Sequence, residues 1–131
     1  MGLIDQALGL FGRGREHRFQ QRMQQASAHH RAGEEAEARA LYERLVVEAT
    51  ELYGADAELT LITRGCVANT YDDEPERAVQ LLEQIVEDGE GLYGPVDDGR
   101  LAPRLDLAMA YGQGGDYTKC HELSEELLAD C

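Results

Sequence analysis

The chain repeats part of its own sequence after 40 residues. Residues 37–46 read EARALYERLV, and residues 77–86 read RAVQLLEQIV. Both segments run on to the tripeptide Leu-Tyr-Gly, at 52–54 and at 92–94, and a shorter third copy occupies residues 120–128. A period of this length is typical of stacked helical hairpins, in which each hairpin buries its apolar face against the next. The repeat therefore predicts an array that offers an extended surface.

Apolar residues recur at spacings of three and four, which predicts helices throughout. We expect an all-α fold, a right-handed solenoid of three helix–turn–helix repeats with a short N-terminal apolar helix in front. The six main helices are predicted at 15–32, 34–53, 56–72, 75–93, 98–113 and 116–129. The residues that mark their ends are Gly33, Gly54 and Gly94 as helix terminators, Pro75 in a first turn, and Asp56 and Asp116 as N-caps. Residues 1–14 form a separate segment, and residues 15–131 form the repeat domain.

The predicted core is aliphatic, because aromatic residues make up only 6% of the chain and tryptophan is absent. The apolar stripes assigned to the second, fourth and sixth helices are Ala38, Leu41, Leu45, Ala49 and Leu52; Ala78, Leu81, Leu82, Ile85 and Leu92; and Cys120, Leu123, Leu127 and Leu128. Each stripe is narrow, so each hairpin is expected to depend on its neighbour for stability.

Charge limits the classes of partner. The net charge is −14, yet residues 1–31 carry five arginines against Asp5 and Glu16, while the remainder carries seven basic and 24 acidic groups. The acidic part of the chain, residues 32–131, would repel nucleic acid and anionic membranes and attract basic surfaces, although its acidic residues also serve solubility. Three cysteines without disulfide spacing fit a reducing, cytoplasmic compartment, and we find neither a membrane-spanning run nor a signal peptide.

The repeats resemble tetratricopeptide (TPR) repeats. The first-helix signature of that family pairs a large and a small residue with an aromatic three positions later and a glycine four beyond it. The first helices match this signature at Leu107-Ala108 with Tyr111 and Gly115, at Val67-Ala68 with Tyr71, and in a degenerate copy at Ala26 and Gly33 with His29 in place of the aromatic residue. The second helices of the family begin with a small residue and pack a large one shortly after. The matching residues here are Ala38/Leu41/Tyr42, Ala78/Leu81/Leu82 and Cys120/Leu123/Ser124. Spacings of 40 and 42 residues are similar to the longer repeats of kinesin light chain type.

The resemblance implies that the first helix of each repeat lines a concave groove for a protein or peptide partner. The positions so nominated for partner binding are Met23, Gln24, Ser27, His30, Arg31, Ile62, Cys66, Asn69, Asp72, Asp73, Leu105, Asp106, Met109 and Gln113. In family members an asparagine at the place of Asn69 often holds the backbone of a bound peptide, and a solvated surface asparagine is the alternative. Because Asp72, Asp73 and Asp106 replace basic groups there, we expect a basic or amphipathic ligand rather than an acidic tail.

The N-terminal segment leaves several interpretations open. Residues 3–11 are strongly apolar, and Gly12-Arg13-Gly14-Arg15 reads as a flexible basic hinge. Residues 2–12 are expected either to cap the first repeat, to dock on another copy of the protein or on the open end of the last repeat, or to lie on a membrane surface with the help of nearby arginines. A homodimer would form through residues 2–12 or through the C-terminal helix.

Motifs that carry chemistry were sought as well. The G-x-G-x-x-G match at 89–94 lies within a predicted helix, and adjacent His29 and His30 point in different directions on a helix, as do Cys120 and His121. We therefore expect no catalytic site, no cofactor and no metal site. The sequence favours a protein-interaction module or adaptor, and the alternative is a regulatory protein that senses a ligand or signalling peptide.

Overall fold

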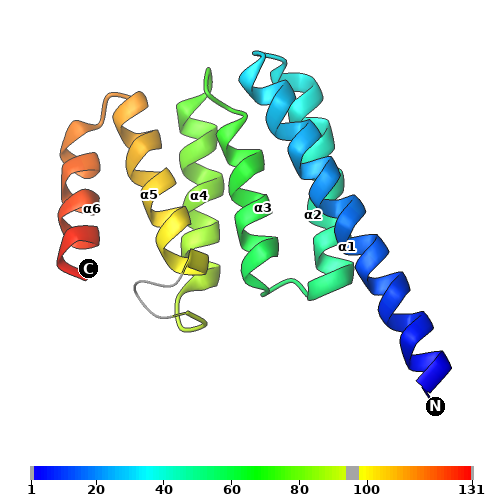
Figure 1. Cartoon of the computed structure of the whole chain (residues 1–131). Coiled ribbons are helices and arrows are strands. Elements are labelled where there is room, and N and C mark those ends of the chain that lie inside the picture. Colours follow the sequence, from blue (N-terminus) through cyan, green and yellow to red (C-terminus); the bar gives the residue numbers. More distant parts are fainter. Residues whose placement is uncertain (1, 94–97, 131) are drawn as a thin grey trace.

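The chain folds into a row of helices. The computed structural model describes residues 2–93 and 98–130, with side chains for 14–93 and 100–130, and over those ranges it contains helices and no strand. The helices are α1 (Gly2–Arg31), α2 (Glu35–Tyr53), α3 (Glu58–Asn69), α4 (Pro75–Gly89), α5 (Asp98–Gln113) and α6 (Tyr117–Asp130). The predicted all-α fold with six main helices is confirmed (Figure 1).

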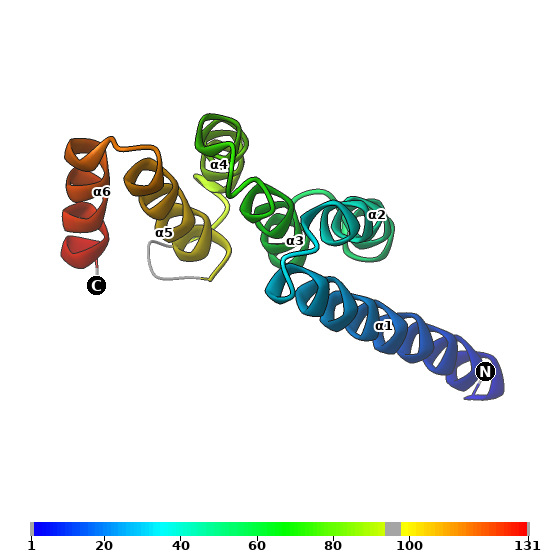
Figure 2. The same cartoon turned by 90° about the horizontal axis from the view of Figure 1, so that it is seen from above.

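Consecutive helices pair into three hairpins, α1–α2, α3–α4 and α5–α6, and the hairpins stack in chain order. α2 packs on α3, α3 contacts both α4 and α5, and α4 also contacts α5. Seen from above, α1, α3 and α5 lie toward one side of the row and α2 and α4 toward the other (Figure 2). This arrangement is a repeat solenoid, in which the first helices of the hairpins form a common face.

The 40-residue sequence repeat returns as a repeat of burial. In α2 the buried positions are Ala38, Tyr42, Leu45 and Ala49, and in α4 they are Ala78, Leu82, Ile85 and Gly89. Spacings of four, three and four residues place each set along one stripe of its helix. The predicted stripes are correct for most of these positions, although Leu41 and Leu81 are half-buried beside the stripe and Tyr42 takes the central place.

Two apolar clusters form the core, and α3 belongs to both. The first cluster joins α1 to α2 around Phe19, Ala26 and Leu45, and the half-buried side chains of Cys66 and Val67 pack against it from α3. The second cluster joins Leu61 and Ala68 of α3 to side chains of α4 and α5, among them Leu82 and Leu107. The described part of the chain is therefore built around two cores, and α3 couples its two halves.

Most turns contain the predicted residues, with two corrections. Gly33 and Gly54 have positive φ angles of 80° and 99°, and the Asp116 carboxylate caps α6 by accepting from the amide of Lys119 at 3.2 Å. α4 ends at Gly89 rather than near 93, because Gly91 takes the positive φ of 80°; Leu92 is consequently 49% exposed instead of buried. The N-cap of α3 is Ala57 rather than Asp56. Gly94 lies outside the described residues.

The hinge predicted at residues 12–15 does not break the helix. Residues 2–11 are helical as expected, but α1 continues through Gly12 and Gly14 to Arg31 as one helix of 30 residues. Its first half extends beyond the other helices (Figures 1 and 2). Two glycines cost helix stability only modestly, and the flanking arginines and glutamines are good helix formers, so the glycines alone do not impose a break. Within the described residues, no helix combines the length and apolarity needed to cross a membrane.

Candidate functional site

One cavity lies among α1, α3 and α5, the first helices of the three hairpins, near their carboxyl ends. It has a volume of about 320 Å³ and is contacted by α1, α3, the turn after α3, the start of α4, and α5. We call it the α1–α3–α5 cavity, and its lining residues are His30, Ala68, Asn69, Tyr71, Asp72, Ala78, Asp106, Met109, Ala110 and Gln113.

The structure brings six of the predicted partner-binding residues together around this cavity: His30, Asn69, Asp72, Asp106, Met109 and Gln113. They lie in the second halves of α1, α3 and α5 or directly after, and α3 contacts α5 while His30 comes from the last turn of α1. Met109 is 56% exposed, and Leu105, one turn earlier on α5 and outside the lining, is 51% exposed. These side chains give α5 an apolar stripe next to the polar cavity.

The other nominated residues occupy different surroundings. Met23 and Cys66 pack against the first apolar cluster, and Ser27 forms a hydrogen bond with Tyr42. Asp73 belongs to a separate shallow surface with Arg77 and Gln80. Gln24 and Arg31 are exposed, and Ile62 is half-buried on α3. None of these side chains lines the α1–α3–α5 cavity.

Cys66 is held as a neutral thiol beneath the face that carries the cavity. Burial raises the pKa of the Cys66 thiol to about 11, and the nearby negative charge of Asp106 adds to that shift, while a hydrogen bond with Tyr42 opposes it. A thiol that keeps its proton at physiological pH is a poor nucleophile and a poor metal ligand. Cys66 therefore acts as a packing residue.

An amide–carboxylate pair connects α3 to α5 across the cavity. Nδ2 of Asn69 donates a hydrogen bond to Oδ2 of Asp106 over 3.4 Å. Burial raises the pKa of the Asp106 carboxyl, and the hydrogen bond from Asn69 lowers it in part. Gly65 lies beneath the same carboxylate oxygen, and a Cβ at that position would meet it at an ordinary contact distance of 3.6 Å. A half-buried carboxylate thus faces the cavity with one neutral donor beside it.

The cavity has a negative electrostatic character from two sources. Asp72 and Asp106 contribute formal charges. In addition, α1 and α3 end beside the cavity at Arg31 and Asn69, and the carboxyl end of a helix is the negative end of its dipole. The combination favours a cation or hydrogen-bond donor as the occupant.

Tyr71 forms a cation-binding platform at the rim, which the sequence analysis treated only as a motif aromatic. The guanidinium carbon of Arg39 lies 3.7 Å from the centre of the Tyr71 ring, and that of Arg77 lies 6.0 Å from it. Arg39 also donates from Nε to Oγ1 of Thr70 at 3.0 Å and from a terminal nitrogen to its carbonyl at 2.8 Å. Arg39 therefore fastens α2 to the carboxyl end of α3. The 31-residue separation between Arg39 and Thr70 hides this contact from sequence patterns.

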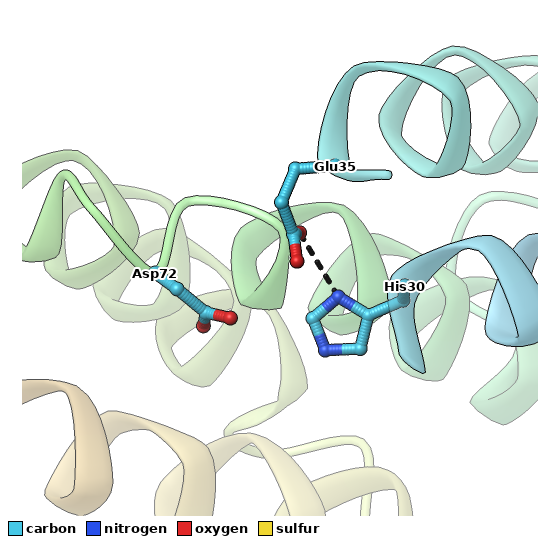
Figure 3. Close-up of side chains that lie close together, drawn as sticks. All are labelled: His30, Glu35 and Asp72. Atoms are coloured by element: carbon cyan, nitrogen blue, oxygen red, sulfur yellow. Dashed lines mark hydrogen bonds and ion pairs between the residues drawn. The ribbon is translucent and has the colours of Figure 1, made fainter. Parts of the chain in front are cut away.

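His30, Glu35 and Asp72 lie close together at one end of the cavity (Figure 3). Nδ1 of His30 and Oε2 of Glu35 are 3.0 Å apart, and the Asp72 carboxylate points toward them from the turn after α3. Local spacing in the sequence does not indicate this group, because its members come from three different elements.

A second, more apolar cavity of about 230 Å³ lies among α2, α3 and α4. Val46, Val67, Leu81 and Ile85 line it together with Arg64, whose guanidinium forms a 2.9 Å ion pair with Asp88. This cavity contains none of the nominated partner-binding residues.

Solved structures of known proteins share the architecture of this chain. No protein-family model matches the sequence, and no curated protein matches it. Among solved structures, the chain is similar to a Podosopora anserina protein described as a putative kinesin light chain with nearly identical TPR-like repeats. One crystal structure of those repeats, from a variant with a single substitution, superimposes with a TM-score of 0.73 at 28% sequence identity, over 86% of this chain and 54% of that chain. A second crystal structure gives a TM-score of 0.72 at the same 28% identity, over 86% and 55% of the two chains.

The chain is a TPR-like repeat protein. It spans about half the length of the structures that it matches. The resemblance inferred from the repeat signature, including the long repeat period of kinesin light chain type, is thereby confirmed. TPR-like repeats generally serve to bind protein partners, and their concave surface, made by the first helices of the repeats, is the usual place for such contacts. The fold is typically non-enzymatic.

Proposed function

We propose that this TPR-like protein is an interaction module whose α1–α3–α5 cavity accepts a basic or amphipathic segment of a protein partner. The observation that carries the proposal is the position of Asp72 and Asp106 in a cavity beside the carboxyl ends of α1 and α3. A lysine or arginine placed there would meet two carboxylates and the negative ends of two helix dipoles, and a charge-assisted hydrogen bond is stronger than a neutral one.

Asn69 supports recognition of a backbone as well as a charge. Its Nδ2 is directed at Asp106, so the same side chain retains a carbonyl oxygen able to accept from a peptide N–H. Beside the polar cavity, the exposed side chains of Leu105 and Met109 supply apolar contact, and methionine adapts its shape to different partners. A segment with basic and apolar residues on one face would engage both parts of this surface.

Titration with designed peptides tests the proposal. Two labelled peptides would share an apolar pattern and differ only in carrying lysine and arginine or aspartate and glutamate, and anisotropy would be followed at about 50 and 150 mM salt. We expect the basic peptide to bind more tightly, with weaker binding at the higher salt. Asp106→Asn and Asp72→Asn should weaken binding several-fold, whereas Glu51→Gln, on the exposed side of α2, should leave it unchanged. Equal affinity for both peptides would contradict the proposal.

We also propose that the protein self-associates, through residues 2–12 or through α6. The first half of α1 extends past the remaining helices, and Tyr117 and Leu128 of α6 are 73% and 77% exposed. Large exposed apolar side chains at an end of a helical array are suited to a second copy or another partner. Light scattering on the full chain and on a chain lacking residues 2–12 tests this. A dimer that the deletion or Leu128→Glu disrupts is expected, and a monomer at every concentration would refute self-association.

A further inference from the structure

The cluster of His30, Glu35 and Asp72 has the composition and spacing of a metal-binding site. The three residues belong to the last turn of α1, the first turn of α2 and the turn between α3 and α4. One potential ligand atom from each lies within 4.8 Å of the others, and His30 and Glu35 are already in contact at 3.0 Å. Figure 3 shows the Asp72 carboxylate and the Glu35 carboxylate both directed at the imidazole ring.

One imidazole and two carboxylates suit a divalent transition metal. Zn²⁺ binds imidazole nitrogen and carboxylate oxygen at about 2.0–2.2 Å, so neighbouring ligand atoms around it lie roughly 3–3.5 Å apart. The contact between His30 and Glu35 already has this separation. Asp72 is exposed, and rotation of its side chain would close the remaining gap without moving a helix. The presence of a nitrogen ligand favours Zn²⁺ or Co²⁺ over Mn²⁺, Ca²⁺ or Mg²⁺, which prefer oxygen.

The backbone holds the first two ligands in register. The turn from α1 to α2 is closed by two hydrogen bonds, from the amide of Gly33 to the carbonyl of His30 at 3.1 Å and from the amide of Glu34 to the carbonyl of His29 at 2.8 Å. With Gly33 at a φ of 80°, this is the Schellman arrangement that ends a helix. It fixes the positions of His30 and Glu35 relative to each other before any ion binds.

The third ligand is positioned by the contact between α2 and α3. Arg39, on the same helix as Glu35, donates two hydrogen bonds to Thr70 and lies against the ring of Tyr71, the residue before Asp72. These contacts tie the turn that carries Asp72 to α2. All three elements are therefore joined independently of the cluster, which reduces the entropy lost when the side chains converge on an ion.

We propose that His30, Glu35 and Asp72 bind a divalent transition-metal ion, with Zn²⁺ as the best fit. Three protein ligands leave at least one coordination position for water or for a ligand atom of a partner. Because His30 and Asp72 also line the α1–α3–α5 cavity, that open position lies at the cavity. Metal binding by these three residues does not depend on which segment the cavity binds. It can therefore be tested separately from the proposed interaction with a partner.

Cobalt serves as the probe, since its visible spectrum reports coordination number and ligand type. The full chain, purified without a histidine tag and kept reduced, would be titrated with Co²⁺, and Zn²⁺ would then be added to displace it. We expect saturable binding of one ion per chain, with absorption typical of nitrogen and oxygen ligands and without the intense band of a cobalt–thiolate bond.

The sequence provides matched controls beside two of the ligands. His29 and Asp73 are the immediate neighbours of His30 and Asp72, so each control variant removes the same chemical group. His30→Gln and Asp72→Asn should weaken Co²⁺ binding by at least about tenfold, and His29→Gln and Asp73→Asn should leave it within about twofold. Circular dichroism of each variant would establish that the helices are retained. Absence of saturable binding in the unmodified chain, or equal weakening by ligand and control variants, would overturn the proposal.

Discussion

Arg39 joins α2 to the carboxyl end of α3 through polar and aromatic contacts. Its two hydrogen bonds end on Thr70, which is fully buried, and its guanidinium stacks on Tyr71. Arg39→Ala would leave the buried carbonyl of Thr70 without this donor, and we expect it to lower the free energy of unfolding by about 1–3 kcal/mol. Urea denaturation followed by circular dichroism measures the change.

Arg44 provides the comparison for that variant. It is an exposed arginine on the same helix, so Arg44→Ala alters net charge and helix propensity in the same way. Its effect should stay within about 0.5 kcal/mol. If the two variants lose the same stability, the contacts of Arg39 with Thr70 and Tyr71 do not contribute as the geometry indicates.

Cys66 should show its raised pKa in its reactivity. In the folded chain the thiol pKa is about 11, against an ordinary value of 9.0. Alkylation with iodoacetamide, mapped by mass spectrometry across pH, should reach half its maximal rate near pH 11 in the native protein and near pH 9 in urea. Because the folded state retains this proton longer, the free energy of unfolding should also fall as pH rises from 9 to 11. A native profile centred near pH 9 would contradict the burial of this thiol.

The residues around the candidate site could be predicted from the sequence only where they share one face of a helix. Asn69, Asp106, Met109 and Gln113 follow from the family's helix pattern, and the structure places them around one cavity. Cys66 fits the same periodicity but packs inward, because periodicity gives a direction on a helix and not the depth of the neighbouring helices. The groups around Tyr71 and His30 unite distant segments, which no local spacing indicates.

At the scale of elements, Gly14 and Gly54 both have room for a side chain, but Gly14 lies inside a helix and Gly54 ends one. Nothing lies within 4 Å of a Cβ placed on Gly14 or on Gly54. Gly14 is inside α1, whereas Gly54 follows α2 with φ 99° and ψ 156°, a conformation almost restricted to glycine. Gly54→Ala should therefore cost about 1–3 kcal/mol, and Gly14→Ala should stabilise α1 by up to about 1 kcal/mol.

Thermal unfolding followed by far-ultraviolet circular dichroism compares the two variants. The expected result is a lower midpoint for Gly54→Ala, and an unchanged or higher midpoint with greater helicity for Gly14→Ala. Greater helicity on replacing Gly14 agrees with a continuous α1. A loss of helicity would instead favour the hinge that the sequence suggested at residues 12–15.

Element boundaries show what sequence chemistry can determine. Gly54, the single glycine after α2, predicts that this helix ends at Tyr53, and the structure confirms that end. After α4 several glycines compete, at 89, 91 and 94, and the repeated Leu-Tyr-Gly motif suggested that α4 would end like α2. The structure ends α4 at Gly89 instead, because Gly91 adopts the positive φ. A repeat in sequence thus predicts the stripe of burial better than it predicts the turn.

At the scale of the whole molecule, we propose that the face formed by α1, α3 and α5 binds partners through the α1–α3–α5 cavity. The fold itself is a TPR-like solenoid, and its repeat period was visible in the sequence. The proposed preference for basic and amphipathic segments rests on the charge of the cavity and on the exposed side chains of α5. The competing location is the apolar cavity among α2, α3 and α4.

Chemical-shift mapping on the labelled full chain tests this claim most directly. A basic amphipathic peptide would be added in steps while backbone amide resonances are followed. We predict shifts concentrated at Asn69, Asp72, Asp106, Met109 and Gln113, and their loss in the Asp106→Asn variant. Shifts concentrated instead at Val46, Val67 and Leu81, or spread evenly over the surface, would contradict it.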